Sequence, residues 1–477
     1  MESEHQVTHI KPRPTEVVEW DDQSTKILKS SRLALTTDPP IASLPQEVLG
    51  YILNFVYQTS DSDKNKRPNT PIAFSHVCKF WQSVALDNSL WWSRIIVTPP
   101  WKLIEVGTFL DRSKECPLDL RIFVNINPTT SNHPTASFPL DNYENLRDLI
   151  SPHIHRCRIF RLQGFFDETA QFLVPYLLES FRHIYMPYLE QFIVDGRLEF
   201  EDEMCTQEPL FSSAPVLRDI RIEGHGLSNY QLPLNTITKL HLTMPELSVG
   251  ISPAHLNIIF NECICLTELV LYDDVLDLEE FPLSPLFNFP SLLTLQLLAH
   301  MTIVSEFLIL ISSAPKLQRL VIVPVTELDL ISLERSTARH NFPSLTSIVL
   351  APMDDVSWAA IEHASTFFPA ITHLTLANVY PDKFRRFFIQ ETTPLFPCLL
   401  DLAMKDIDES LGRMINDFVV IRHSKKAPLR TVFVDEVSMR HLSPYSRLWG
   451  DTKVVGVDLI GPLGEDLTHT VKHRFVG

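Results

Sequence analysis

The sequence is poor in glycine and cysteine, and it has no long run of apolar residues. It contains 13 glycines and seven scattered cysteines in 477 residues. So few glycines argue against glycine-rich phosphate loops, and an odd number of cysteines favours a reduced intracellular protein over a disulfide scaffold. The best apolar stretch, Phe307 to Ile311, is bounded by Glu306 and Ser312. We therefore expect no transmembrane helix, and the polar first 40 residues predict no signal peptide.

Positive charge is also in deficit, because the formal net charge is −17. A nucleic-acid-binding protein needs a basic face to neutralise phosphates, so we expect no nucleic acid partner. The apolar fraction of 45% is ordinary for a globular protein of the cytoplasm or nucleus. The chain is too long for one compact core, which predicts several domains or an extended array.

Recognisable catalytic motifs are absent. The sequence has no nucleotide-binding glycine loop, no nucleophile elbow and no zinc-protease helix. His153, His155 and Cys157 alternate and would share one face of a strand, but their spacing supplies no fourth zinc ligand. Cys263 and Cys265 are interpreted as packing residues at a helix-to-strand join. We therefore predict no catalytic residue, no metal ligand and no cofactor, and expect that the chain is not an enzyme.

Amphipathic helices are what the sequence does contain between residues 41 and 92. Pro45 and Glu47 suit the first turn of a helix, where a missing N–H is tolerated and a negative charge is favourable. One apolar stripe at helical spacing follows, made of Val48, Leu49, Ile52, Leu53 and Val56. A second helix is predicted from about Ile72 to Leu86. A unit of this size buries little surface alone, so we expect it to dock onto something.

The order of four short motifs in this stretch resembles the F-box. The motifs are Leu44-Pro45-x-Glu47, Ile52-Leu53, Val77-Cys78-x-x-Trp81 and Leu90-Trp91. In that family a three-helix unit binds a Skp-type adaptor, which joins a cullin scaffold in a ubiquitin ligase. The resemblance covers roughly 50 residues, and a polar insert, Thr59 to Thr70, departs from the family pattern at a small cost in loop closure. It implies ten adaptor-binding residues, some of which must be core rather than contact: Leu44, Pro45, Glu47, Ile52, Leu53, Val77, Cys78, Trp81, Leu90 and Trp91.

A repeat dominates the remainder of the chain. Its common form, [Phe/Ala]-Pro-x-Leu-x-x-Leu-x-Leu, occurs at 214–222, 289–297 and 314–322. The spacing is about 27 residues, within the range of leucine-rich repeats. The first Leu-type position of each copy defines twelve anchors: Cys157, Leu189, Leu217, Ile237, Leu266, Leu292, Leu317, Leu345, Ile371, Leu399, Leu429 and Val454.

Each repeat predicts a short strand followed by a helix. The last two leucines would point inward from the strand, and helical stretches are expected at 303–311, 358–367 and 411–421. The proline before each strand ends the preceding helix. Because each unit has only one apolar face, neighbours must stack to bury it. The segment 116–122 is expected to be an irregular first strand.

These repeats resemble leucine-rich-repeat proteins, and F-box proteins that carry such repeats form a known family. The predicted fold class is α/β, with an N-terminal three-helix F-box-like unit followed by an irregular leucine-rich-repeat solenoid. A parallel sheet would line the concave face of this solenoid. The predicted domains are a flexible arm (1–39), the F-box-like domain (40–97) and the solenoid (98–477).

Outward-facing strand positions form the second candidate site. Early and late repeats carry charged residues there, and the middle repeats carry an apolar patch. Exposed apolar patches tend to be interaction sites, although a loop or the C-terminal tail could instead cover this one. The client-binding candidates are Arg221, His241, Tyr272, Leu298, Val321, Val323 and Val349.

The leading hypothesis is the substrate-recognition subunit of a cullin-based ubiquitin ligase. The F-box-like unit would bind a Skp-type adaptor, and through it cullin, and the repeats would bind a protein client. The alternative is a non-degradative scaffold whose F-box-like cap does not engage the adaptor. Neither hypothesis includes a nucleic acid or membrane partner.

Overall fold

A computed structural model describes most of the chain between residues 41 and 456, in two compact units that divide between Trp91 and Trp92. We call them the helical unit and the repeat unit. The described residues are 41, 44–59, 70–98, 101–123, 140–163, 176–195, 209–223, 226–227, 230–243, 250–272, 275–277, 286–298, 303–332, 342–353, 356–389, 395–446 and 449–456. The predicted arm (1–39) and most of the insert between Thr59 and Thr70 lie outside the described residues.

Among the described residues, the helical unit has three short α-helices and a 3₁₀ turn. They are α2 (Gln46–Thr59), α3 (Thr70–Ser75), α4 (Lys79–Asp87) and η2 (Ser89–Trp92). Leu49 and Leu53 of α2 are buried, as are Phe74 of α3 and Val84 of α4. Trp91 completes this small core, with its ring centroid 5.5 Å from that of Phe74.

The prediction of a single helix from Ile72 to Leu86 was wrong, because the chain breaks between α3 and α4. Cys78 has an extended backbone, with φ −159° and ψ 172°. Its Sγ accepts a hydrogen bond from the backbone N–H of Trp81 at 3.5 Å, which caps the start of α4. The apolar periodicity runs through the break, so periodicity alone did not reveal it.

The repeat unit is built on one parallel sheet. In the described chain this sheet has 14 strands, ordered as they occur in the sequence, and every adjacent pair is parallel. Its strands are β1 (Arg94–Val97), β2 (Leu118–Phe123), β3 (Cys157–Gln163), β5 (Gln191–Asp195), β7 (Asp219–Glu223), β8 (Lys239–Thr243), β9 (Glu268–Tyr272), β11 (Thr294–Leu298), β13 (Arg319–Ile322), β14 (Ser347–Leu350), β15 (His373–Leu376), β16 (Asp401–Met404), β17 (Thr431–Val434) and β18 (Lys453–Gly456). Two-stranded pairs join β4 (Ile184–Tyr185) to β6 (Phe211–Ser213) and β10 (Phe287–Asn288) to β12 (Ile311–Ser313).

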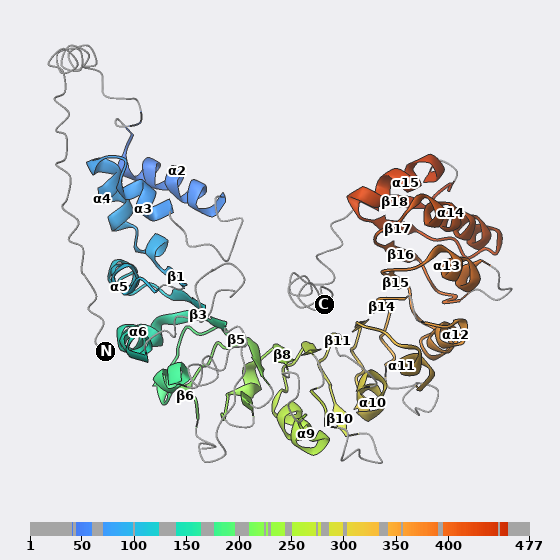
Figure 1. The fold of residues 1–477 in the computed structure, drawn as a ribbon, viewed down its shortest axis with the longest axis horizontal. Coiled ribbons are helices and arrows are strands. Elements are labelled where there is room, and N and C mark those ends of the chain that lie inside the picture. Colours follow the sequence, from blue (N-terminus) through green and yellow to red (C-terminus); the bar gives the residue numbers. More distant parts are fainter. Residues whose placement is uncertain are drawn as a thin grey trace, which may run out of the picture. The chain divides into compact units, whose positions relative to one another are not determined.

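Helices alternate with these strands and lie along one side of the sheet (Figure 1). The α-helices are α5 (Leu103–Arg112), α6 (Leu140–Ile150), α9 (Pro253–Glu262), α10 (Ile303–Leu310), α11 (Glu327–Ser332), α12 (Trp358–Phe367), α13 (Pro381–Phe388), α14 (Glu409–Ser424) and α15 (Glu436–Ser446). The 3₁₀ turns are η3 (Ser151–Arg156), η4 (Glu179–Phe181) and η6 (Leu234–Thr236). The three predicted helical stretches correspond to α10, α12 and α14. The structure therefore confirms the alternation that the sequence predicts.

The repeat anchors set the register of the sheet. Each anchor from Leu189 to Leu429 lies two residues before the first residue of its strand and is buried. Val454 was misplaced, since it lies inside β18 and Asp451 occupies the equivalent position. The first strand was also misplaced, because β1 precedes β2 and pairs with it. β1 thus belongs to the sheet, although the predicted solenoid began at residue 98.

The predicted fold class is confirmed. This is an α/β protein with N-terminal helices and then a long parallel sheet with alternating helices, an arrangement consistent with a leucine-rich-repeat-like solenoid. In the part of the chain that the structure describes, every helix is too short or too polar to cross a bilayer.

Candidate interaction surfaces

Helix α2 carries apolar side chains on two of its faces. Leu49 and Leu53 point into the helical unit and are buried. A second set stays exposed, with exposed fractions from 40 to 78%, and we call it the α2 stripe: Val48, Tyr51, Ile52, Phe55 and Val56. Its spacing of i, i+3, i+4, i+7 and i+8 places the set on one side of the helix. The sequence predicted a single stripe, but the structure divides those residues between core and surface.

Two further apolar side chains of the helical unit are exposed. Val77 lies in the break between α3 and α4, Leu90 lies in η2, and each is 57% exposed. Singly exposed apolar residues are ordinary on a protein surface, so Val77 and Leu90 gain meaning from the larger α2 stripe exposed in the same unit.

The ten predicted adaptor-binding residues fall into three groups in the structure. Six are exposed: Pro45, Glu47, Ile52, Val77, Cys78 and Leu90. Leu44 and Trp81 are half-buried. Leu53 and Trp91 are core residues, and the indole Nε1–H of Trp91 donates to Asn54 Oδ1 at 3.2 Å. The burial of these last two agrees with the expectation that some of the ten are core rather than contact, and adaptor binding by any of them stays a prediction.

Tyr51 and Phe55 are exposed residues of the α2 stripe that the sequence analysis missed. They are 78% and 68% exposed. Their spacing of four residues on a predicted helix was a usable signal. The family motifs do not include these two positions, and the interpretation of α2 as a helix with a single apolar stripe leaves them out.

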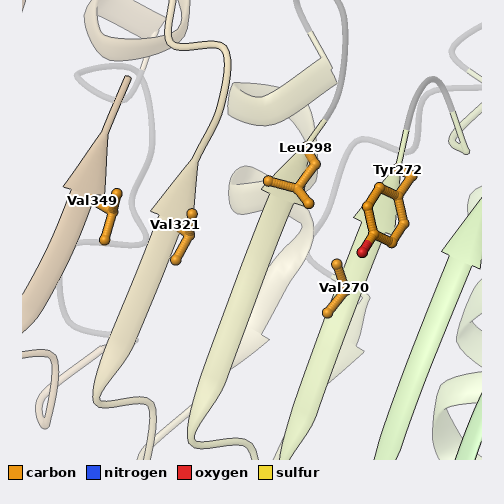
Figure 2. Close-up of a cluster of buried hydrophobic side chains, with 5 residues drawn as sticks. All are labelled: Val270, Tyr272, Leu298, Val321 and Val349. Carbon is orange, nitrogen blue, oxygen red and sulfur yellow. The ribbon is translucent and has the colours of Figure 1, made fainter. Parts of the chain in front are cut away.

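The apolar patch predicted on the strands forms a single cluster across neighbouring strands of the repeat unit. Figure 2 shows its side chains on one face of the sheet. The cluster consists of Val270, Tyr272, Leu298, Val321 and Val349, and half-buried Val323 packs against it. Val321 and Val349 stand directly opposite each other in the register, as do Tyr272 and Leu298.

This cluster is buried, with exposed fractions from 0 to 8%. Strands about 4.8 Å apart pack their facing side chains against one another, which accounts for part of the burial. The expectation of an open apolar surface at Tyr272, Leu298, Val321 and Val349 is therefore wrong, and the covered alternative agrees with these exposures. Whether these residues take part in client binding stays a prediction.

Basic side chains occupy the equivalent register position in strands that come earlier in the sheet than the apolar cluster. We call them the basic row: Arg121, Arg161, Arg221 and His241. Arg121 of β2 stands opposite Arg161 of β3, and Arg221 of β7 stands opposite His241 of β8. Arg221 and His241 are half-buried. The Cζ atom of Arg221 lies 4.9 Å from the centre of the Tyr272 ring, a cation–π contact that links the basic row to the apolar cluster.

A polar chain crosses three strands near the other end of the sheet. Thr372 Oγ1 lies 2.7 Å from His373 Nδ1, and His373 Nε2 lies 2.9 Å from the buried Asp401 Oδ2. Hydroxyl, imidazole and carboxylate follow in the order used by hydrolases. Arg430 also pairs with Asp401, however, and neutralises the charge that would stabilise an imidazolium. We interpret the chain as a link between β15, β16 and β17.

The residues weighed for zinc binding do not lie on one strand. His153 and His155 lie in η3, while Cys157 begins β3. Burial, and then the positive charge of Arg156, lowers the pKa of His153. Burial raises the pKa of the Cys157 thiol to about 12, and does the same for Cys263, whereas Cys265 is exposed.

Comparison with known proteins gives no assignment: no family model matches the chain, and no curated protein matches it.

Proposed function

We propose that this protein is the substrate-recognition subunit of a cullin-based ubiquitin ligase, acting in the cytoplasm or nucleus. Its helical unit would bind a Skp-type adaptor, and its repeat unit would bind a protein client. The chain itself would position the client for a separate enzyme rather than catalyse a reaction.

The α2 stripe is the observation that carries the proposal. Five exposed apolar side chains on one helix face leave a surface that water solvates poorly, and Val77 and Leu90 are exposed in the same unit. These side chains lie among the very motifs that resemble the F-box, and Ile52, Val77 and Leu90 belong to both sets. A partner helix or groove that covered them would gain about 1.5–3 kcal/mol for each large side chain that becomes buried.

The repeat unit supports the client-binding half of the proposal by its architecture. A stacked parallel sheet presents one row of side chains from each strand on the face away from the helices. Repeat proteins use such extended faces to hold partner proteins.

Adaptor capture tests the proposal directly. The full chain and a double variant, Ile52→Ser with Leu90→Ser, are incubated with a purified Skp-type adaptor and co-precipitated. Both residues are exposed, so the variant should keep its thermal unfolding profile. Losing the burial of two such side chains should weaken capture by about tenfold or more.

The matched control is Ile258→Ser in the repeat unit. Ile258 is 62% exposed, at least as exposed as Leu90 (57%) and Ile52 (42%) of the helical unit. Its substitution should leave capture unchanged. Equal recovery of wild type and double variant, or no capture by wild type, would reject the adaptor assignment.

The scaffold alternative is distinguished by a deletion of residues 60–69, within the insert that departs from the F-box pattern. If capture appears only after this deletion, the native chain does not engage the adaptor and acts as a scaffold. If wild type and deletion variant are captured alike, the insert is neutral and the receptor proposal is supported.

A further inference from the structure

The α2 stripe has the geometry of one half of a helix pair. Its five members cover an arc of about 140° around the axis of α2, which turns about 100° with each residue. Two aromatic residues supply most of the exposed surface, since Tyr51 is 78% and Phe55 is 68% exposed. Helices that pair along their length use the same spacing of three and four residues. The stripe therefore fits the apolar face of another helix.

Helix α2 is anchored from its opposite side. Leu49 and Leu53 are buried in the helical unit, and Asn54 Oδ1 accepts a hydrogen bond from the indole of Trp91 at 3.2 Å. At the start of the helix, Gln46 Nε2 donates to Oδ2 of Asp87 at the end of α4, also at 3.2 Å. Because the backbone of α2 is already ordered, a partner that covers the stripe pays little conformational entropy.

The charge on α2 determines which direction of pairing two copies of the helix would favour. Glu47 is the one charged residue between Gln46 and Thr59. In a parallel pair the two Glu47 carboxylates would lie side by side and repel each other. In an antiparallel pair they would lie roughly 14 Å apart along the axis, where salt screens most of the repulsion. Charge therefore favours the antiparallel pair.

The apolar side chains also match in the antiparallel direction. Val48, Ile52 and Val56 are evenly spaced along the stripe, with Ile52 at the centre. When two copies of α2 run in opposite directions about this centre, Ile52 meets Ile52, and Val48 of each copy faces Val56 of the other. The stripe is thus complementary to itself, as a two-fold interface requires.

The area of the stripe is sufficient for a weak dimer. A buried aromatic side chain covers about 150–250 Å², so hiding Tyr51, Phe55 and the three aliphatic residues removes roughly 500 Å² from each copy. The total of roughly 1,000 Å² lies at the lower limit for a specific interface. We expect a dissociation constant on the order of 10 μM, which leaves the stripe accessible to a tighter partner.

We propose that the α2 stripe pairs antiparallel with the α2 stripe of a second copy of this chain when no adaptor is bound. The pairing depends only on the exposed residues of α2. Its regulatory consequence rests on the proposed function, because the adaptor and the second copy then compete for Ile52 and its neighbours. Self-association keeps the apolar stripe covered until the adaptor displaces the second copy.

Sedimentation velocity of the full chain over a concentration series tests the pairing. Wild type should form a dimer as its concentration rises. Val48→Lys and Val56→Glu each place a charge within the apolar seam, and each should weaken the dimer about tenfold or more. Both positions are exposed, so thermal unfolding of the two variants should match that of wild type. The matched control, Ile258→Ser, removes an exposed apolar side chain of the repeat unit and should leave the dimer unchanged.

An equimolar mixture of the Val48→Lys and Val56→Glu chains tests the direction of pairing. Antiparallel helices bring the introduced ammonium group of one chain against the introduced carboxylate of the other, and they leave valine against valine at the second contact. The mixture should therefore regain a dimer within about threefold of the wild-type affinity. A parallel pair, or a nonspecific apolar aggregate, would gain nothing from mixing.

Three results would overturn the inference. They are a wild type that stays monomeric throughout the series, a dimer that resists both substitutions, and a mixture that associates no better than its components. Purified Skp-type adaptor is then added to the wild-type dimer and should convert it into a complex with one copy of each chain. A complex that retains two receptor chains on this helix contradicts the competition.

The same measurements separate this inference from the proposed function. A monomeric wild type that still captures the adaptor contradicts only the pairing of α2. A dimer that passes the mixing test but captures no adaptor contradicts only the adaptor assignment.

Discussion

Two cysteine side chains of the repeat unit, Cys157 and Cys263, are buried among apolar neighbours. Burial disfavours the thiolate, so the pKa of each thiol rises from 9.0 to about 12. In the unfolded chain both thiols regain the ordinary value. The folded state therefore binds more protons than the unfolded state between pH 9 and pH 12.

Stability should fall as the pH rises through this window. The contribution of each thiol is complete below pH 9 and is lost progressively up to pH 12, because only the unfolded chain gains by deprotonation there. By pH 10 each thiol should cost about 1–2 kcal/mol of unfolding free energy. Urea unfolding at pH 8 and pH 10 measures the change.

The double variant Cys157→Ala with Cys263→Ala serves as the comparison for that measurement. It is expected to lose about 3 kcal/mol less than wild type between the two pH values, whatever its starting stability. An identical loss in both proteins would show that the two thiols do not set the alkaline limit.

At the scale of elements, a buried arginine joins helix α14 to the turn before β16. Arg422 is 1% exposed, and burial lowers its pKa to about 10. It has no carboxylate partner among the described residues and donates instead to backbone carbonyls. These belong to Leu395, Phe396, Pro397, Leu399 and Ala427. The arrangement satisfies carbonyls that the turn would otherwise bury without partners.

Replacing Arg422 by Met should lower the free energy of unfolding by about 3 kcal/mol, because several buried carbonyls lose their donor at once. The matched control is Arg413→Met on the exposed side of the same helix, where the change should stay within about 0.5 kcal/mol. Urea unfolding of both variants measures the difference. Equal stabilities would show that water or other donors replace the guanidinium.

Elements with strong repeating patterns were predictable from the sequence. The anchors from Leu189 to Leu429 located the strands because each must be buried for neighbours to stack, which favours leucine or isoleucine at that position. Strand β1 (Arg94–Val97) was not predicted, because it lacks the proline that comes before the strands of the repeat and lies just after the two tryptophans. The break at Cys78 was hidden as well, because a cysteine is a weak cap that propensity does not single out.

The candidate surfaces were predictable only in part. Sequence periodicity located the apolar positions of α2 but could not decide which of its two apolar faces is core. Strand alternation located Val321 and Val349 on the face away from the helices, yet exposure depends on what packs over that face. The basic row could be recognised only from the pairing register, because Arg121, Arg161 and Arg221 are far apart in the sequence.

For the whole molecule, the sequential order of the strands limits how many strands should lose stability when one core residue is replaced. Each strand of the sheet pairs only with its neighbours in the chain order. The buried Leu402 of β16 is a suitable probe. Leu402→Ala leaves a cavity and should cost about 2–5 kcal/mol in local stability.

Hydrogen exchange measured by mass spectrometry should show this loss in β15, β16 and β17. Exchange in β3 and β5 should remain as in wild type, since opening free energies in stacked repeats are largely local. Leu162→Ala in β3 should give the mirror-image pattern. Uniform acceleration across the sheet in either variant would mean that the repeat unit opens as one cooperative block.

The common direction of all strands bears on how such a chain can evolve. Two parallel neighbours must be joined by a crossover connection. Each segment of about 27 residues therefore contains one strand and the connection that leads to the start of the next strand. A gene duplication or deletion of one such segment would reverse no strand and change no pairing partner's orientation. The length of the sheet can thus change by whole modules, one segment of about 27 residues at a time.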